Sequence, residues 1–189
     1  MRSITKQLLI ILISALPVAA MAHPGHASQA GFWTGFIHPF TGLDHLTMAI
    51  GFGVLLWTVA KKWKVLGIVG LSLSLVFGFV LGANGIIADA IAEYGIVTSL
   101  IVLAVALWSK SYRLLPFVAL LMASFHGAAH GVELAPQGHV IALISGMVLG
   151  MATLYTIGLV VGELINRHVP YGRKVLSALA MLVAIIGLA

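Results

Sequence analysis

Two short histidine-containing segments carry residues whose types and spacing could bind a metal ion. The first, HPFTGLDH, spans residues 38–45, and the second, HGAAHGVE, spans residues 126–133. The chain has no cysteine, which excludes thiolate metal sites and disulfides. Imidazole and carboxylate ligands suit Ni, Co, Zn or Cu better than Mg or Ca. We predict that the two segments together supply the metal ligands, namely His38, Asp44, His45, His126, His130 and Glu133.

The second segment fits one face of a helix. His126 and His130 are four residues apart, so they lie on the same face, about 6 Å apart along the axis. Glu133 follows one turn after His130 on that face. Two imidazoles at this spacing can bind one ion, as they do in zinc-protease helices. The alternative is a pair of interfacial histidines that are hydrogen-bonded to backbone.

The first segment contains a predicted break in a helix. Pro39 and Gly42 both interrupt helices, so a helix that restarts near Gly42 places Asp44 and His45 in its first turn. His38 then lies on the preceding irregular part and can fold back towards them. The alternative is a capping box formed by Thr41 and Asp44. That alternative explains neither histidine, and capping and metal binding can coexist.

Four further residues are candidates for auxiliary metal capture. His23 and His26 lie near the predicted mature N-terminus, where a flexible tail is the alternative. Asp89 and Glu93 are one helical turn apart and could attract cations, although an ordinary solvated helix start explains them equally well. Met48 lies one turn from Asp44 and His45, and core packing explains it better than ligation.

The elements that must position these residues are membrane helices. Of 189 residues, 61% are hydrophobic and 8% charged, whereas soluble domains carry roughly 25% charged residues. The basic residues that give the net charge of +5 lie between apolar segments, so a nucleic-acid partner is not expected. The composition predicts a membrane protein, and with the two histidine segments it gives the lipid bilayer and a transition-metal ion as the expected partners. No prosthetic group is expected.

A secretory signal peptide is predicted at residues 1–22. Arg2 and Lys6 precede an apolar stretch, and Ala20-Met21-Ala22 is a small-x-small cleavage site. An uncleaved first membrane helix is the alternative. Residues 23–189 then form one transmembrane domain, an all-α polytopic helix bundle with six spans near the roughly 20 residues that a bilayer requires. The spans are expected at about 32–60, 65–83, 86–108, 114–132, 138–164 and 175–188.

The charges between the spans predict an orientation. All eight basic residues after Lys6 follow the first, third and fifth spans, and the remaining loops carry none. Basic loops stay in the cytoplasm, so both the mature N-terminus and the C-terminus are expected in the periplasm. Both histidine segments then lie toward the outer end of the bundle. Glycine pairs at four-residue spacing predict close helix packing, and these are Gly78/Gly82, Gly127/Gly131, Gly146/Gly150 and Gly158/Gly162.

The motifs quoted above resemble those of the HupE/UreJ family over nearly the whole chain. The resemblance rests on His23-Pro-Gly-His26, on the segment from His38 to His45 and on Phe125-His126-Gly-x-Ala-His130-Gly-x-Glu133. It implies a secondary permease that takes up Ni²⁺ or Co²⁺ across the inner membrane of a Gram-negative bacterium and feeds metalloenzyme assembly. Metalloenzyme maturation proteins are the partners it suggests, and Zn²⁺ and a homo-oligomer are left open.

An enzymatic function is the competing hypothesis. Histidines and Asp44 could hold zinc and activate water, with Ser124 assisting, as in an intramembrane zinc hydrolase. Against this, the sequence lacks HExxH, and the predicted ligand set leaves no obvious open coordination position for water. We therefore expect a transporter rather than an enzyme.

Overall fold

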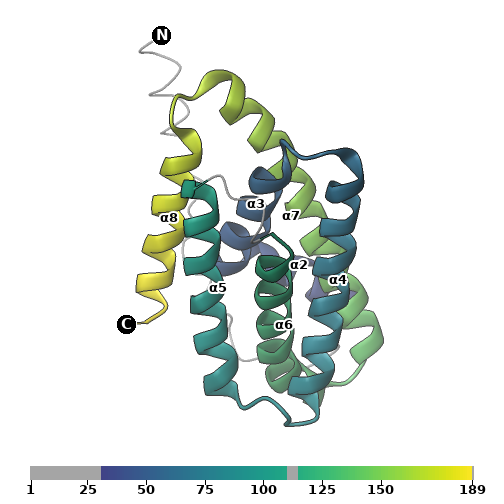
Figure 1. The fold of residues 1–189 in the computed structure, drawn as a ribbon. Helices are drawn as coiled ribbons and strands as arrows, with labels where there is room; N and C mark the ends of the chain where they lie inside the picture. The colour runs from purple at the N-terminus through teal and green to yellow at the C-terminus, as the bar shows by residue number, and fades with distance from the viewer. Residues whose placement is uncertain (1–30, 110–114, 189) are drawn as a thin grey trace.

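The computed structural model describes residues 31–109 and 115–188, which form an all-helical bundle without strands (Figure 1). The predicted signal peptide, His23 and His26 lie outside the described residues. The elements are α2 Phe32–Ile37, η1 His38–Phe40, α3 Leu43–Leu56, α4 Lys61–Ala83, α5 Asp89–Ser109, α6 Leu115–Leu134, η2 Ala135–Gln137, α7 Val140–His168 and α8 Gly172–Ile186.

The predicted break in the first span is confirmed. The segment Phe32–Phe40 and helix α3 are bent by 78° relative to one another. Pro39 lies in the 3-10 turn η1, and Gly42 has an extended backbone (φ −94°, ψ 129°) at the N-terminus of α3. Asp44 and His45 are therefore in the first turn of α3, as expected, and His38 lies across the bend from them.

The capping-box interpretation of Thr41 and Asp44 is wrong. Gly42 is the N-cap residue of α3, and no side chain caps that helix. The Thr41 hydroxyl instead donates to the His38 carbonyl at 2.8 Å. This bond closes the turn before α3 and leaves the Asp44 carboxylate available to the histidines.

Four described helices are long and apolar enough to cross a membrane, and the bent pair raises this number to five. The four are α4, α5, α7 and the part of α6 from Phe117 onward. Helix α8 has 15 residues, so it is about 22 Å long and shorter than a hydrocarbon core of roughly 30 Å. The sixth predicted span is therefore not confirmed.

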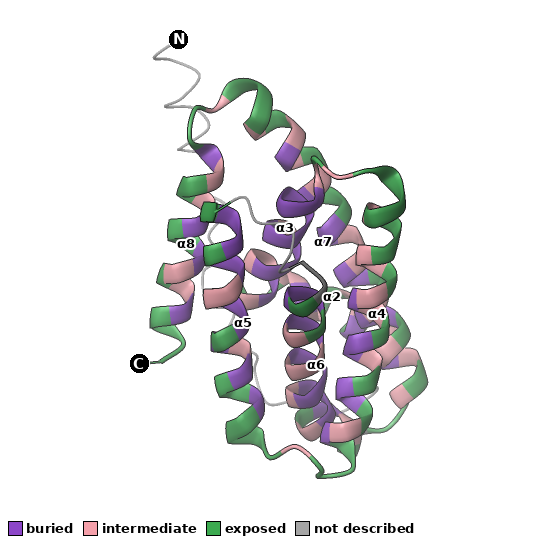
Figure 2. Ribbon diagram, viewed as in Figure 1, coloured by how far each residue is buried: buried purple, intermediate pink, exposed green. Residues whose placement is uncertain are grey.

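The surface of the bundle is apolar where lipid would surround it. Leu73 and Phe77 on α4, Phe117 on α6 and Val160 on α7 are all exposed, whereas Phe52 and Leu103 are fully buried. Figure 2 shows the buried residues on the inward faces of the helices and the exposed ones on the outside. A soluble protein rarely exposes so much contiguous apolar surface, and a membrane protein requires it.

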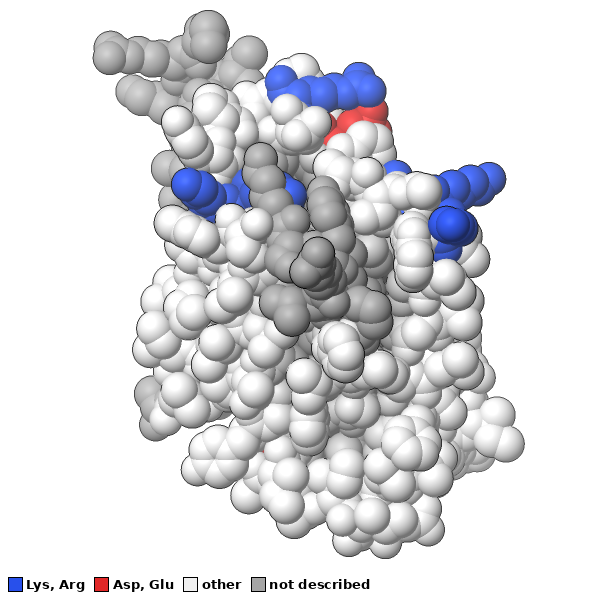
Figure 3. All heavy atoms as spheres, viewed as in Figure 1, with Lys and Arg blue, Asp and Glu red and all other residues white. Residues whose placement is uncertain are grey.

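The basic residues gather at one end of the molecule (Figure 3). They lie where α4 begins, where α7 ends and where α8 begins. Three of them lie over aromatic rings, with Lys62 Nζ 5.9 Å from the Trp63 ring centre, Lys64 Nζ 4.3 Å from that of Trp57 and Lys174 Nζ 4.9 Å from that of Trp108. Basic and aromatic residues together are typical of the cytoplasmic interface. Glu163 and Arg167, one helical turn apart on α7, also form an ion pair at this end.

The glycine pairs bring helix backbones together, as predicted. A Cβ at any of the eight positions would meet atoms of a neighbouring helix at less than 3.0 Å. Gly78 and Gly127 face the partner backbone between α4 and α6, while Gly146 and Gly158 do the same for α7 against α2 and α3. Both parts of the broken span, α2 and α3, therefore pack against α7.

Candidate metal centre

Five of the six predicted ligands come together where the bend of the first span meets α6. Two groups of three possible ligands occur among the described residues, and in each the ligand atoms lie within 4.8 Å of one another. One group is His38, His45 and His130, and the other is Asp44, His45 and His126. The ring centres of His38 and His130 are 4.4 Å apart, and those of His45 and His126 are 4.8 Å apart.

The cluster lies inside the bundle rather than at its outer surface. His130 and His126 precede the last residue of α6 by four and eight positions, which places them about 6 and 12 Å from that end. On the other side, Gly150 of α7 contacts Phe36 and Pro39, and Gly158 contacts Ile50. The bend is thus level with the middle of the 29-residue helix α7. The sequence predicted that both histidine segments lie nearer to the end of the bundle.

His126 presents a bare ring nitrogen to the carboxylate of Asp44. Its Nδ1 donates to the Met122 carbonyl at 2.7 Å, so the neutral ring carries no proton on Nε2. That Nε2 is buried, lacks a hydrogen-bond partner and lies 3.3 Å from Asp44 Oδ2. Two electron-pair acceptors face one another at this point. The arrangement is favourable only when a positive charge, either a metal ion or a second ring proton, lies between them.

The spacing of these two atoms matches that of neighbouring metal ligands. Metal–nitrogen and metal–oxygen bonds of about 2.0–2.2 Å separate adjacent ligands by roughly 3.0–3.5 Å in tetrahedral or octahedral geometry. The bond from His126 Nδ1 to a backbone carbonyl also fixes the ring orientation, as outer-shell partners of metal-binding histidines do. The pair is therefore pre-arranged for a cation.

His45 connects the two groups. Its Nδ1 donates to Asp44 Oδ1 at 2.9 Å, because a carboxylate can only accept. Its Nε2 then carries the lone pair and lies 2.6 Å from Nε2 of His130, which donates to it. The remaining nitrogen of His130, Nδ1, is buried and has no partner among the described residues. The cluster thus holds two buried, unpartnered ring nitrogens, one on His126 and one on His130.

Glu133 lies outside both groups. Its side chain is exposed near the end of α6, and it is not among the residues whose ligand atoms converge. Its role as a ligand stays a prediction. Met48 is fully buried next to the centre, with its sulfur 3.6 Å from the Ser99 hydroxyl, which agrees with the packing role expected of it.

A cavity of about 260 Å³ leads to Asp44 between helices α3, α5 and α8. Glu93 of α5 and Asp44 both line it, together with apolar residues such as Val97 and Val183. The Asp44 side chain is 30% exposed, in contrast to the fully buried His126. Glu93 therefore borders the same cavity as Asp44, and its auxiliary role stays a prediction.

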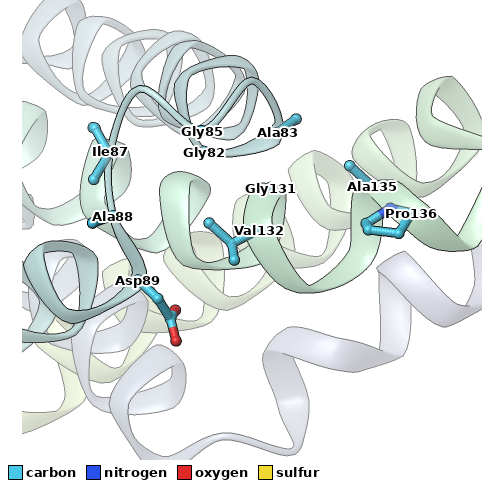
Figure 4. Close-up of a pocket in the computed structure, with 10 residues that line it drawn as sticks. All are labelled: Gly82, Ala83, Gly85, Ile87, Ala88, Asp89, Gly131, Val132, Ala135 and Pro136. Atoms are coloured by element: carbon cyan, nitrogen blue, oxygen red, sulfur yellow. The ribbon is translucent and has the colours of Figure 1, made fainter.

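Asp89 faces a different cavity, of about 490 Å³, beside the connection between α4 and α5 (Figure 4). Among the residues that line this cavity, Asp89 is the charged one, and none of the five clustered residues takes part. Asp89 and Glu93 are thus one turn apart on α5 but border separate spaces. The sequence did not distinguish them.

The Met122 carbonyl is a functional group that the sequence analysis did not identify. This carbonyl accepts the hydrogen bond from His126 Nδ1, which keeps the ring proton on Nδ1 and leaves the unprotonated Nε2 facing Asp44. The signal is present in the sequence as the four-residue spacing between Met122 and His126 on one helix. Many helical histidines have such a carbonyl within reach, however, so the spacing alone does not identify one that binds metal.

Comparison with known proteins gives one family and one curated relative. The family profile described as "HupE / UreJ protein" matches residues 10–189. The chain is 31% identical over 151 residues to "Protein HupE" from Rhizobium leguminosarum bv. viciae, which covers 77% of this chain and 76% of that protein. No solved structure matches.

Proposed function

Because this chain belongs to the HupE/UreJ family, which is associated with nickel and cobalt uptake for hydrogenase and urease, we propose that it is a nickel or cobalt permease. In this proposal it carries Ni²⁺ or Co²⁺ from the periplasm across the inner membrane as a secondary transporter, and supplies metalloenzyme maturation. The family comprises transporters and accessory proteins rather than enzymes, which disfavours the zinc-hydrolase alternative.

The bare Nε2 of His126 opposite the Asp44 carboxylate is the observation that carries this proposal. A charge buried within a membrane bundle costs about 2.5–3.5 kcal/mol on insertion scales, so an intramembrane carboxylate needs a functional reason. Here Asp44 is surrounded by imidazoles whose free lone pairs can replace the water ligands of a divalent ion. The carboxylate offsets the cost of bringing a +2 charge into a low dielectric.

The membrane potential supplies the direction of transport in this proposal. An inside-negative potential favours inward movement of a divalent ion by roughly 4–5 kcal/mol per 100 mV. The basic end of the bundle faces the cytoplasm under the positive-inside rule, so the ion approaches from the opposite end. The centre is about 6–12 Å from that end of α6.

Metal accumulation in cells tests the proposal. We expect His45→Ala and His130→Ala to reduce nickel and cobalt uptake at least about tenfold at equal expression, because each removes a ligand from the centre. His168→Ala is the matched control, since this exposed histidine lies at the basic end of α7. Unchanged uptake of both metals in the first two variants would refute a permease that works through this centre.

A further inference from the structure

The two nitrogens of His45 face two different groups of ligands. Nδ1 is 2.9 Å from Asp44 Oδ1, and Nε2 is 2.6 Å from His130 Nε2. We propose that the centre holds two overlapping metal positions that share His45, and that a divalent ion passes from one to the other. The carboxylate position comprises Asp44, His45 and His126, and the three-histidine position comprises His38, His45 and His130.

The geometry of an imidazole ring requires two positions. Its two nitrogens lie on different sides of the ring and their lone pairs diverge, so both cannot bind the same ion. With metal–nitrogen bonds of about 2.0–2.1 Å, ions on the two sides of the ring would be about 6 Å apart. Ligands on both sides of His45 therefore cannot converge on one ion, and a single six-ligand site does not fit this arrangement.

Each position contains a residue with an unpartnered buried ring nitrogen. His126 Nε2 lies at the carboxylate position, 3.3 Å from Asp44 Oδ2, and His130 of the three-histidine position has no partner at Nδ1 among the residues described. These residues are 0% and 4% exposed, so bulk water does not reach the two nitrogens. A cation at the carboxylate position would satisfy the bare Nε2 of His126.

The two positions are filled one at a time. Two divalent ions repel each other four times as strongly as two single charges, and the cluster offers one carboxylate to offset them. Filling one position therefore disfavours the other. When the ion moves from Nδ1 to Nε2 of His45, the ring proton moves the other way, from Nε2 to Nδ1, where Asp44 Oδ1 accepts its hydrogen bond. The ion is thus passed across without returning to water. This relay rests on the proposed function, because it describes how the transported ion moves within that centre.

A double-mutant cycle on the purified full-length chain, with Co²⁺ as the probe, tests the relay. Asp44→Asn impairs the carboxylate position, His38→Gln impairs the three-histidine position, and the double variant impairs both. Equilibrium dialysis gives stoichiometry and affinity, and the visible absorption of bound Co²⁺ reports its ligand geometry. His168→Ala again serves as the control.

We expect one Co²⁺ per chain in the wild type and in both single variants, with different absorption spectra in the two. Each single variant should weaken Co²⁺ binding by less than about tenfold, because the other position remains. The double variant should weaken it at least about 100-fold more than the product of the two single-variant effects. Additive losses, identical spectra in the single variants or two ions bound per wild-type chain would overturn the relay. Absence of any cobalt binding to the wild type would overturn the proposed function itself.

Discussion

The protons on a few ring nitrogens determine what the centre can do. His126 donates a hydrogen bond from Nδ1–H to the Met122 carbonyl, and His45 donates one from Nδ1–H to Asp44, so each neutral ring has a lone pair on Nε2. These hydrogen bonds orient the rings before any ion arrives. Preorganised ligands lower the cost of binding because less side-chain freedom is lost when the ion binds.

Glu93 gives a prediction about how the ion approaches. Because Glu93 and Asp44 line one cavity, Glu93→Gln should lower the initial rate of cobalt uptake about two- to tenfold at low ionic strength, and less at high ionic strength. Asp89→Asn is the matched control, since Asp89 borders the other cavity. Equal effects of the two substitutions, or no effect of Glu93→Gln at low ionic strength, would contradict this approach route.

The sequence indicated the candidate ligands, and the structure was needed to group them. The four-residue spacing of His126 and His130 was sufficient to place both on one face of α6. The grouping of Asp44 with His126, and of His38 with His130, depends on how the bend packs against α6, which no local pattern encodes. The capping-box prediction failed because Thr41 bonds backward to His38 rather than forward into α3.

Close contacts between helix backbones at glycine residues hold the candidate ligands in position. Helix α6, which carries His126 and His130, packs on α4 through Gly127 and Gly131. Any side chain at these positions pushes the two backbones apart and displaces the histidines from the bend. The rigidity of this pair is therefore a condition for the spacing of the ligands.

Gly131→Ala should destabilise the bundle, because its Cβ would meet the Phe79 carbonyl in α4. Overpacking of this kind costs about 1–3 kcal/mol, which should lower the midpoint of thermal unfolding in detergent. Gly70→Ala is the matched control on α4, since its Cβ would meet nothing within 4 Å and removing a helical glycine stabilises by about 0.5–1 kcal/mol. A midpoint as high for Gly131→Ala as for Gly70→Ala would contradict close packing between α4 and α6.

The elements themselves were predicted unequally well. Pro39 and Gly42 correctly indicated the break, because both disfavour a continuous helix. The last predicted span was harder to assess from sequence, since an apolar stretch does not show where the helix begins and ends, and so whether it is long enough to cross a bilayer. Helix α8 begins at Gly172 and has only 15 residues, so a sixth crossing is not established by length.

For the molecule as a whole, the separation of charge fixes the expected orientation. The described lysines and arginines gather at one end (Figure 3), whereas His126 and His130 lie in the half of α6 that is farther from that end. In the proposed function, with the basic end in the cytoplasm, an ion would reach the centre from the periplasm and leave through the basic half. That half has no comparable cluster of metal ligands among the residues described.

Cysteine labelling tests this orientation, and the chain is well suited to it because it contains no cysteine of its own. We expect Asn84→Cys, in the exposed connection between α4 and α5, to react with a membrane-impermeant maleimide in spheroplasts. Lys62→Cys, exposed at the basic end, should react only after the membrane is disrupted. The reverse pattern would show that the bundle is inserted the other way round.

The location of the metal ion itself tests the central claim most directly. Anomalous X-ray scattering from crystals soaked in cobalt or nickel should give a peak about 2.0–2.2 Å from a ring nitrogen of His45, with Asp44 and His126 or His38 and His130 completing the contacts. A peak that excludes His45, or no peak in this cluster at saturating metal, would contradict the account.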